Sequence, residues 1–278
     1  MTHALTIATA LRDARGCGVD RLDAQLLLAH VTGRSRAWLL THDDASLTDG
    51  QETRFREMLA RRAAGEPFAY LVGEREFHGL ALAVGPGVLV PRPDTETLVD
   101  WALELLFRDA ADSPAVLDLG TGSGAIALAL KHRCSSAHVW ASERSADALA
   151  IARANAERLG LDIHFAQGSW WDALDDAPVF DMAVSNPPYI AEDDPHLAAL
   201  THEPLSALVA ADDGLADIRV IAAGARGRLR PGGWLMFEHG WTQADAVSAI
   251  LRECGFDGVQ TRLDIEGRPR CTGGWLQA

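Results

Sequence analysis

Residues 115–124 of this 278-residue chain read AVLDLGTGSG, and this stretch decides the fold. An apolar segment leads into a glycine-rich turn, and the apolar-periodic run 125–130 follows directly. A strand, a glycine turn and the start of a helix, in this order, form the first unit of a doubly wound α/β sheet. The glycines allow a tight turn and the close approach of a ligand to the backbone, at the positive end of a helix.

The acid inside this stretch distinguishes between two kinds of ligand. Gly120, Gly122 and Ala125 satisfy the loose spacing of a dinucleotide-binding turn, which by itself is weak support for NAD. Asp118 lies at the carboxyl end of the strand, where its charge would repel a pyrophosphate. The same carboxylate suits a ligand that carries an ammonium and a sulfonium group. The turn therefore favours the methyl donor S-adenosyl-L-methionine over NAD.

A second acid supports this interpretation. Glu143 follows the apolar stretch 138–141, at about the ~20-residue separation expected of a ribose-binding carboxylate. Its oxygens can accept hydrogen bonds from both ribose hydroxyls. The alternative is that Glu143 is only a solvent-facing residue at the end of a strand, and the spacing leaves that alternative open.

Asn186-Pro187-Pro188-Tyr189 follows the apolar run 179–184 and offers a site for a planar amino group. Neither proline has an N–H, so the backbone carbonyls here are not drawn into a ladder or a helix. The Asn186 side-chain oxygen and the Pro187 carbonyl can both accept from one NH2 group, and the Tyr189 ring can lie over the flat group that carries it. A strand-to-loop turn without chemistry is the alternative interpretation of these four residues.

Composition and charge limit the kinds of partner. Apolar residues make up 48% and charged residues 23% of the chain, values that are ordinary for a globular protein. The formal net charge is −14, whereas proteins that bind nucleic acids usually present a basic face. No apolar run approaches the ~20 residues that span a bilayer, and residues 1–5 lack the features of a signal peptide. We therefore expect a cytoplasmic protein with no membrane partner, and the charge disfavours direct binding to nucleic acid.

The cysteines and histidines show no metal-binding or nucleophile pattern. Four cysteines are scattered without Cys-x-x-Cys spacing, and the ten histidines form no ligand motif. We expect free thiols, no metal site, and structural or surface roles for His78, His196 and His239.

The chain divides into three predicted segments. Residues 1–72 carry apolar residues at helical spacing in three stretches, two rich in leucine before residue 33 and a third at about 48–64, which predicts a small helical-bundle domain that binds a partner. Residues 73–91 read as a connecting β-hairpin with strands at 80–84 and 88–90. Residues 92–278 alternate between helices and strands. This alternation predicts a doubly wound, mainly parallel seven-stranded sheet, including a helix at 213–229 and a strand at 233–238.

Together these motifs resemble the class I S-adenosylmethionine-dependent methyltransferases that modify planar nitrogens. Further stretches resemble, more narrowly, the release factor glutamine methyltransferase family (PrmC, also called HemK). They are Phe77, PRPDTE at 91–96, EPLSAL at 203–208 and EHG at 238–240. The resemblance covers nearly the whole chain, and the first of these hexapeptides combined with Asn-Pro-Pro-Tyr is highly specific.

The resemblance implies a protein methylation enzyme of translation termination. Members of this family use S-adenosyl-L-methionine to methylate the side-chain amide nitrogen of the glutamine in the Gly-Gly-Gln motif of peptide chain release factors. A release factor is thus the implied protein partner, and we expect the enzyme to be monomeric. The residues expected to bind the donor are Asp118, Gly120, Thr121, Gly122, Ser123, Gly124, Glu143, Trp170 and Asn186.

The resemblance assigns the methionine part of the donor to the glycine turn, the ribose to Glu143 and the adenine to Trp170. Two positions depart from the family pattern. The ribose position is usually Asp, so Glu143 is one methylene longer. Ser169 stands where an Asp commonly precedes the adenine-stacking aromatic residue, which leaves recognition of the adenine amino group open.

Asn186 and Pro187 are the expected catalytic residues, and they bind the glutamine together with Pro188 and Tyr189. An amide nitrogen is a poor nucleophile because its lone pair is delocalised into the carbonyl. As it attacks the methyl carbon it becomes positive, and its two hydrogens become stronger donors. Acceptors fixed on those hydrogens bind the transition state better than the ground state. No residue needs to be a strong base.

Two other functions remain open. A methyltransferase for an exocyclic amine of adenine or guanine in DNA or RNA would use the same acceptor residues. The acidic balance and the lack of a basic target-recognition segment count against it. A non-catalytic scaffold that binds the donor is the third reading, and the intact Asn-Pro-Pro-Tyr sequence disfavours it.

Overall fold

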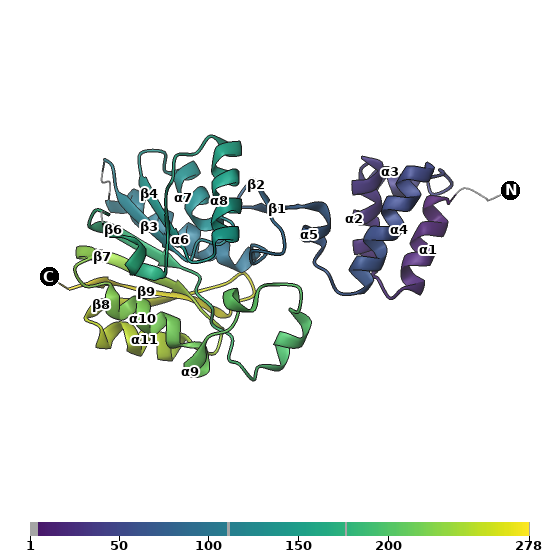
Figure 1. Cartoon of the computed structure of the whole chain (residues 1–278). Coiled ribbons are helices and arrows are strands. Elements are labelled where there is room, and N and C mark those ends of the chain that lie inside the picture. Colours follow the sequence, from purple (N-terminus) through teal and green to yellow (C-terminus); the bar gives the residue numbers. More distant parts are fainter. Residues whose placement is uncertain (1–4, 110–111, 176, 278) are drawn as a thin grey trace. The chain divides into compact units, whose positions relative to one another are not determined.

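The computed structural model describes residues 5–109, 112–175 and 177–277 (Figure 1). Most of the segment in which we expected no signal peptide, residues 1–4, lies outside this part. The chain separates into two compact units, Met1–Gly73 and Glu74–Ala278. Among the described helices, none is long and apolar enough to cross a membrane.

The first unit is built from helices whose starts are set by side-chain caps. Thr6, Asp20, Ser35 and Thr48 each accept a hydrogen bond from a backbone N–H of the first helical turn. These bonds satisfy donors that have no partner within the helix. The helices are α1 (Ile7–Gly16), α2 (Arg21–Thr32), α3 (Arg36–Thr41), α4 (Asp49–Ala63) and α5 (Phe68–Val72). The three predicted helices are thus confirmed, and the short α3 and α5 were not predicted.

The second unit begins with a hairpin that differs from the predicted one. Strand β1 (Glu74–Phe77) pairs antiparallel with β2 (Leu80–Ala83), around a two-residue turn at His78-Gly79. Both turn residues have positive φ, 50° and 81°, the conformation that matches the twist of a tight hairpin. The predicted strand at 88–90 was wrong. The backbone N–H of Val90 donates to a Glu203 carboxylate oxygen at 3.0 Å, so it takes no part in a ladder.

A seven-stranded sheet forms the centre of this unit, in the order β5-β4-β3-β6-β7-β9-β8. The first five strands in this order are parallel to one another, and β9 is antiparallel to both β7 and β8. This topology confirms the predicted fold. The strands are β3 (Ala115–Leu119), β4 (His138–Glu143), β5 (His164–Gln167), β6 (Phe180–Ser185), β7 (Leu229–Glu238), β8 (Phe256–Leu263) and β9 (Pro269–Leu276).

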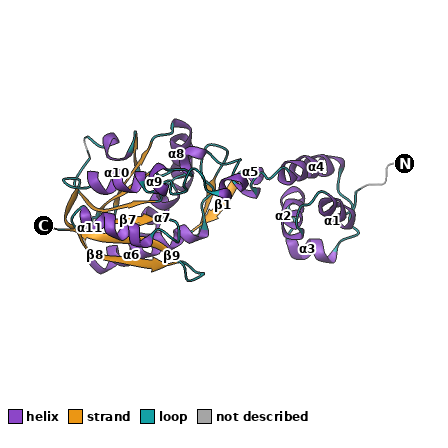
Figure 2. Ribbon diagram, turned by 90° about the horizontal axis from the view of Figure 1, so that it is seen from below, coloured by secondary structure: helices purple, strands orange, loops and turns teal. Residues whose placement is uncertain are grey.

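Helices cover both faces of the sheet (Figures 1 and 2). One apolar core joins the sheet to α6 (Glu96–Asp109), α7 (Ala125–Arg133) and α8 (Ala146–Leu159). A second core joins the other face to α10 (Ala216–Gly224) and α11 (Ala244–Glu253). Shorter helices are η1 (Pro93–Thr95), η2 (Trp170–Ala173), η3 (Pro195–Ala199), η4 (Leu205–Ala207) and α9 (Ala211–Gly214).

The predicted helix at 213–229 was too long at both ends. Asp212, Asp213 and Gly214 all have positive φ, which interrupts the helix before α10 begins. At the other end Leu229 already pairs with Phe180 in the sheet, so the strand predicted at 233–238 starts four residues earlier.

The strand order places the functional region. The chain winds outward from β3 to β4 and β5, then returns to the other side of β3 to form β6 and β7. The carboxyl ends of β3 and β6 therefore flank the point where the winding direction reverses. In open α/β sheets, ligands bind in the crevice at that point.

Candidate active site

An open cavity of about 1050 Å³ lies at the carboxyl ends of the parallel strands. Its walls come from the segment 87–95, the glycine turn after β3, the ends of β4 and β6, and the loop 204–207. The predicted site residues that line it are Gly120, Thr121, Gly122, Ser123, Glu143, Trp170, Asn186 and Pro188. Those outside the lining are Asp118, Gly124, Pro187 and Tyr189. The structure thus brings seven of the nine residues predicted to bind the donor, but only two of the four predicted to bind the glutamine, to one cavity.

The glycine turn uses its own N–H groups to hold its shape. The N–H groups of Gly120 and Thr121 donate to the carbonyl of Ser142 at 2.9 and 3.0 Å, and that of Gly122 donates to Glu143 Oε2 at 3.0 Å. These donors are therefore not available to cradle a phosphate, as a dinucleotide-binding turn requires. The geometry thus disfavours a dinucleotide through these occupied donors, and not through a charge of Asp118 facing the ligand, as the sequence had suggested.

Gly120 also makes room for an aromatic wall. A Cβ at this position would lie 2.9 Å from the ring of Trp170, and its φ of +74° is one that other residues rarely adopt. Trp170 itself has a φ of 49°, a left-handed conformation that costs a non-glycine residue free energy. With this backbone conformation the ring lines the cavity next to the turn.

Neighbouring polar groups orient Trp170. Its side chain is hydrogen-bonded to Asp217 on α10, and both residues line the cavity together with Ser169. Burial raises the pKa of Asp217, while this bond and the charge of Arg144 lower it. The next residue, Trp171, points elsewhere, because its Nε1 donates to the carbonyl of Ile221 at 2.8 Å in the core.

Asp118 supports the turn from beneath rather than facing the cavity. Its Oδ2 accepts from Thr121 Oγ1 at 2.6 Å and from the N–H of Ala127 at 3.1 Å, so it connects the strand, the turn and the start of α7. Its Oδ1 is buried and has no hydrogen-bond partner within the described ranges. Burial raises the pKa of Asp118 to about 7, a shift that the two hydrogen bonds oppose and the charge of Glu143 increases.

Glu143 connects the turn to the next strand. Its Oε2 accepts from the N–H of Gly122 at 3.0 Å, and its Oε1 accepts from the N–H of Ser145 at 2.8 Å. Each carboxylate oxygen can accept more than one hydrogen bond. Because the side chain also lines the cavity, it can still accept from hydroxyl groups of a ligand.

Asn186 is oriented by a residue that is distant in sequence. Its Nδ2 donates to Thr95 Oγ1 at 3.3 Å, at the end of η1. An amide that donates through its nitrogen keeps its oxygen as an acceptor, and among the described residues no hydrogen bond reaches Asn186 Oδ1. The side chain at the cavity wall therefore presents an acceptor to a ligand.

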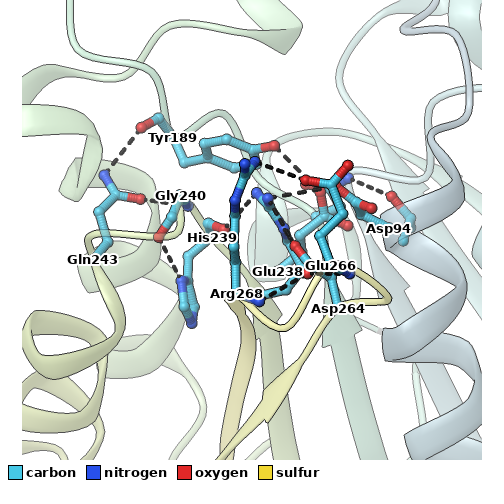
Figure 3. A network of polar contacts seen from close by, with 12 residues as sticks. Asp94, Tyr189, Glu238, His239, Gly240, Gln243, Asp264, Glu266 and Arg268 are labelled. Carbon is cyan, nitrogen blue, oxygen red and sulfur yellow. Dashed lines mark hydrogen bonds and ion pairs between the residues drawn. The ribbon is translucent and has the colours of Figure 1, made fainter.

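Tyr189 is held at both of its ends (Figure 3). Its hydroxyl donates to Glu238 Oε1 at 3.3 Å, and its backbone carbonyl accepts from Gln243 Nε2 at 3.0 Å. Burial and the nearby charge of Glu238 raise the pKa of Tyr189 well above its usual value, so the phenol is neutral. These contacts hold the ring in place at the end of the Asn-Pro-Pro-Tyr segment.

A buried carboxylate fastens two walls of the cavity to each other. Glu203 accepts from the N–H of Val90 at 3.0 Å and from the Arg92 guanidinium at 2.5 Å. Arg92 lines the cavity, and so does Pro204, which follows the carboxylate in the chain. The family resemblance rests partly on both segments, 91–96 and 203–208, but no role for either was evident from the sequence.

The three histidines considered earlier lie outside the cavity lining. His78 Nε2 pairs with Asp100 Oδ1 at 2.9 Å, and His196 Nδ1 with Asp194 Oδ1 at 2.7 Å. His239 is buried and shares a hydrogen bond of 2.7 Å with Thr272. Within the described ranges, no group of three or more His, Cys, Asp or Glu side chains is arranged to hold a metal ion.

Comparison with known proteins assigns the chain to a family. The PrmC N-terminal domain matches residues 3–73, and the methyltransferase small domain matches residues 95–209. A release factor glutamine methyltransferase from Bordetella pertussis is 51% identical over 261 residues, which is 93% of this chain and 96% of that protein. The chain belongs to the release factor glutamine methyltransferase family. Members from Burkholderia pseudomallei and Escherichia coli are 48% and 46% identical, covering 97% and 91% of this chain and 96% and 91% of their own.

Solved structures support the fold of this family member. The 16S rRNA methyltransferase RsmC of T. thermophilus, in complex with AdoMet and guanosine, has a TM-score of 0.55 at 22% identity, over 73% of this chain and 50% of that one. The hMettl16 catalytic domain has a TM-score of 0.59 at 18% identity, over 83% of this chain and 82% of that one. At these identities the similarity concerns the fold alone.

Three residues of this methyltransferase site were not predicted from the sequence. Thr95 orients Asn186, Asp217 orients Trp170, and Glu238 receives the Tyr189 hydroxyl. Thr95 and Glu238 lie in stretches that resemble the family, which was the available signal. Asp217 carried no signal beyond being an acid in the first turn of a helix.

Proposed function

We propose that this chain transfers the methyl group of S-adenosyl-L-methionine to the side-chain amide nitrogen of the glutamine in the Gly-Gly-Gln motif of peptide chain release factors. One observation carries the proposal. The nitrogen of Asn186 is engaged by Thr95 at 3.3 Å, so the amide presents its oxygen at the wall of a cavity that the glycine turn also lines. An acceptor fixed there suits an incoming NH2 group.

The residues around the cavity fit the proposed donor. The N–H groups of Gly120 and Thr121 already donate to the carbonyl of Ser142, so they cannot bind a phosphate. The absence of a side chain at Gly120 leaves room for the flat ring of Trp170 at the cavity wall. We assign the methionine part of the donor to residues 120–124, the ribose hydroxyls to Glu143 and the adenine ring to Trp170. When bound, S-adenosylmethionine supplies an electrophilic methyl group on its sulfonium.

Asp118 and Asp217 support these contacts. Asp118 holds the turn and the start of α7 through Thr121 and Ala127, which fixes the backbone that the donor approaches. Asp217 orients the indole of Trp170 and lies in the cavity lining beside Ser169. Ser169 stands where the family commonly has an acid. Asp217, which lines the same cavity, can accept a hydrogen bond in place of that acid.

The residues of the acceptor half bind and orient the glutamine amide. Asn186 Oδ1 and the carbonyl of Pro187 accept from its two hydrogens, and the ring of Tyr189 covers its planar face. As the nitrogen gains positive charge, both acceptors bind these hydrogens more strongly, so the residues stabilise the transition state selectively. Holding the amide in line with the transferred group contributes a further share. This scheme assigns no residue as a strong base.

The first unit and the net charge of the protein both bear on which partner it binds. We propose that residues 1–73, which match the PrmC N-terminal domain, bind the release factor. The net charge of −14 suits a protein partner better than a nucleic acid. The four cysteines are free thiols, as is usual in a reducing compartment. We propose that the enzyme acts in the cytoplasm and as a monomer.

Incubation with labelled donor and a purified release factor tests the proposal. Mass spectrometry of the peptide that contains Gly-Gly-Gln should show one added methyl group on the glutamine. An unmodified glutamine, together with label in ribosomal RNA, would instead assign the enzyme to nucleic-acid methylation. Light scattering on a sizing column measures the oligomeric state in the same preparation.

A further inference from the structure

A buried carboxylate lies behind the acceptor half of the cavity. Glu238, the last residue of β7, is 1% exposed and accepts a hydrogen bond from the Tyr189 hydroxyl at 3.3 Å (Figure 3). It also accepts a hydrogen bond from Thr95. Thr95 Oγ1 in turn accepts from Asn186 Nδ2 at 3.3 Å. One carboxylate therefore connects two residues of the Asn-Pro-Pro-Tyr segment.

We propose that Glu238, acting through Thr95, is the positioning residue that keeps the Asn186 oxygen turned toward the glutamine. This inference takes its substrate, the glutamine, from the proposed function. The hydrogen bonds from which it is argued do not depend on that function. Neither Glu238 nor Thr95 reacts with the substrate in this scheme. They determine which end of the Asn186 amide faces the cavity.

The direction of the hydrogen bonds explains this role. A hydroxyl has one hydrogen to donate and lone pairs with which to accept. Because Thr95 gives its hydrogen to Glu238, its oxygen can only accept from Asn186, and it therefore selects the NH2 end of that amide. The opposite orientation would present an NH2 group to the NH2 group of the substrate, which is a donor facing a donor.

The surroundings keep Glu238 an acceptor. Burial raises the pKa of Glu238 to about 7, against the opposing hydrogen bonds from Thr95 and Tyr189 and the charge of Arg270. Its Oε2 has no hydrogen-bond partner in the part of the chain that the structure describes. A proton can therefore reside on Oε2 while Oε1 continues to accept. The direction of the chain is the same in both protonation states.

A second layer holds the carboxylate region in place. Arg270 pairs with Asp264 at 3.1 Å and with Asp94 at 3.4 Å, and it donates to the carbonyl of His239 at 3.3 Å. Asp94 precedes Thr95 in the chain, and His239 follows Glu238. Both ends of the Thr95–Glu238 contact are thus tied to the same guanidinium.

Substitutions at Thr95 and Glu238 test the direction of the chain. Thr95→Val keeps the shape but removes the hydroxyl, and Thr95→Ser keeps the hydroxyl. We expect Thr95→Val to lower kcat for release factor methylation about tenfold or more, the loss of roughly one hydrogen bond. Thr95→Ser should recover most of that loss. The donor Kd from calorimetry should stay within about threefold of wild type in both variants.

A second pair addresses the carboxylate itself. Glu238→Leu removes the acceptor and should lower kcat as Thr95→Val does, whereas Glu238→Gln retains an acceptor oxygen and should recover part of the rate. Glu253→Gln, the same chemical change on the exposed side of α11, is the control and should behave as wild type. If Glu238→Leu does not fold, as judged by its thermal unfolding, the Thr95 pair decides alone.

A measurement without turnover separates this inference from the proposed function. The chain has two asparagines, Asn155 and Asn186, so 15N-asparagine labelling yields two pairs of side-chain NH2 signals, one pair for each residue. Asn155 donates to the carbonyls of Ala83 and Ser123 and serves as an internal reference. In Thr95→Val only the Asn186 pair should shift and lose protection from exchange. Unchanged Asn186 signals, or a wild-type kcat in Thr95→Val, would overturn the inference. Failure of the wild-type enzyme to methylate the release factor would overturn only the function.

Discussion

The part of the cavity that we propose binds the donor (the donor half, residues 118–124, Glu143 and Trp170) and the part that we propose binds the glutamine (the acceptor half, residues 186–189) are held together in different ways. In the donor half, Thr121 bonds to Asp118 three residues away, and Gly122 bonds to Glu143 across 21 residues. In the acceptor half, Asn186 bonds to Thr95 across 91 residues and Tyr189 to Glu238 across 49. The glycine turn of the donor half is held by its own strand and helix and by one neighbouring strand, whereas the acceptor half exists only once distant segments have assembled.

This difference predicts separable effects of mutation. Changes in the donor half should act on donor affinity and on the stability of the turn. Changes in the acceptor half should act on kcat and leave donor affinity largely intact. Four experiments can break or sharpen this division.

The largest effect is expected for Asn186→Ala. The variant loses the side-chain acceptor that strengthens its bond in the transition state, so kcat should fall by about 100-fold or more. Donor Kd from calorimetry should stay within about threefold of wild type, since the glycine turn is unchanged. Turnover of the release factor near the wild-type rate would contradict the assignment of the acceptor half.

Gly120→Ala should produce the next largest effect, a loss of donor affinity in the donor half of the cavity. A Cβ there would meet the Trp170 ring at 2.9 Å, in addition to the strain of a positive φ. Gly122→Ala is the matched control, because its φ is also positive but its Cβ would meet nothing within 4 Å. We expect donor affinity to fall about tenfold more in Gly120→Ala than in Gly122→Ala, a difference of roughly 1.4 kcal/mol. Equal affinities in the two variants would mean that the ring does not bind the donor.

Glu143→Ala should weaken donor binding about tenfold, because it removes the acceptors for the ribose and releases Gly122. Glu143→Asp retains a carboxylate one methylene shorter, so it should lose less affinity than Glu143→Ala. Calorimetric titration of the donor into each variant measures the effect. If Glu143→Ala lowered kcat at saturating donor and left donor affinity unchanged, Glu143 would not belong to the donor half.

The smallest effect is a pH dependence of stability. The pKa of Asp118 is about 7 in the folded protein, above its ordinary 3.8, so the folded state holds the proton over this interval and the unfolded state does not. The free energy of unfolding should therefore decrease as pH rises, by about 1 kcal/mol between pH 6 and pH 8 from this group. That loss corresponds to a fall in Tm of roughly 2–4 °C.

Asp118→Asn should remove this part of the slope in thermal unfolding measured across pH. A residual slope of the same sign should remain, because burial also raises the pKa of Glu238 to about 7. An unchanged slope in Asp118→Asn would show that the carboxyl group at position 118 is already ionised in the folded protein at pH 6.

The predictable parts of this protein are those in which neighbouring residues cooperate. Residues 115–130 specify a strand, a turn and a helix by themselves, and the glycines and acids at the strand ends indicated the donor site. The prediction of a hairpin strand at residues 88–90 was wrong for the opposite reason. Residues 88–90 have a strand-like composition, but Glu203, more than 100 residues away, takes the N–H of Val90. Nothing near residue 90 in the sequence indicates that Glu203 is its partner.

The sequence by itself determined the parallel sheet and the glycine turn, because hydrophobic period and backbone chemistry are local. The tertiary structure alone decided which side chains face the cavity. It placed Asp118 beneath the turn, directed Trp170 to the cavity and Trp171 into the core, and set Thr95 against Asn186 and Glu238 against Tyr189. The physical reason is that a hydrogen bond depends on distance and direction in space, whereas a motif records only spacing along the chain.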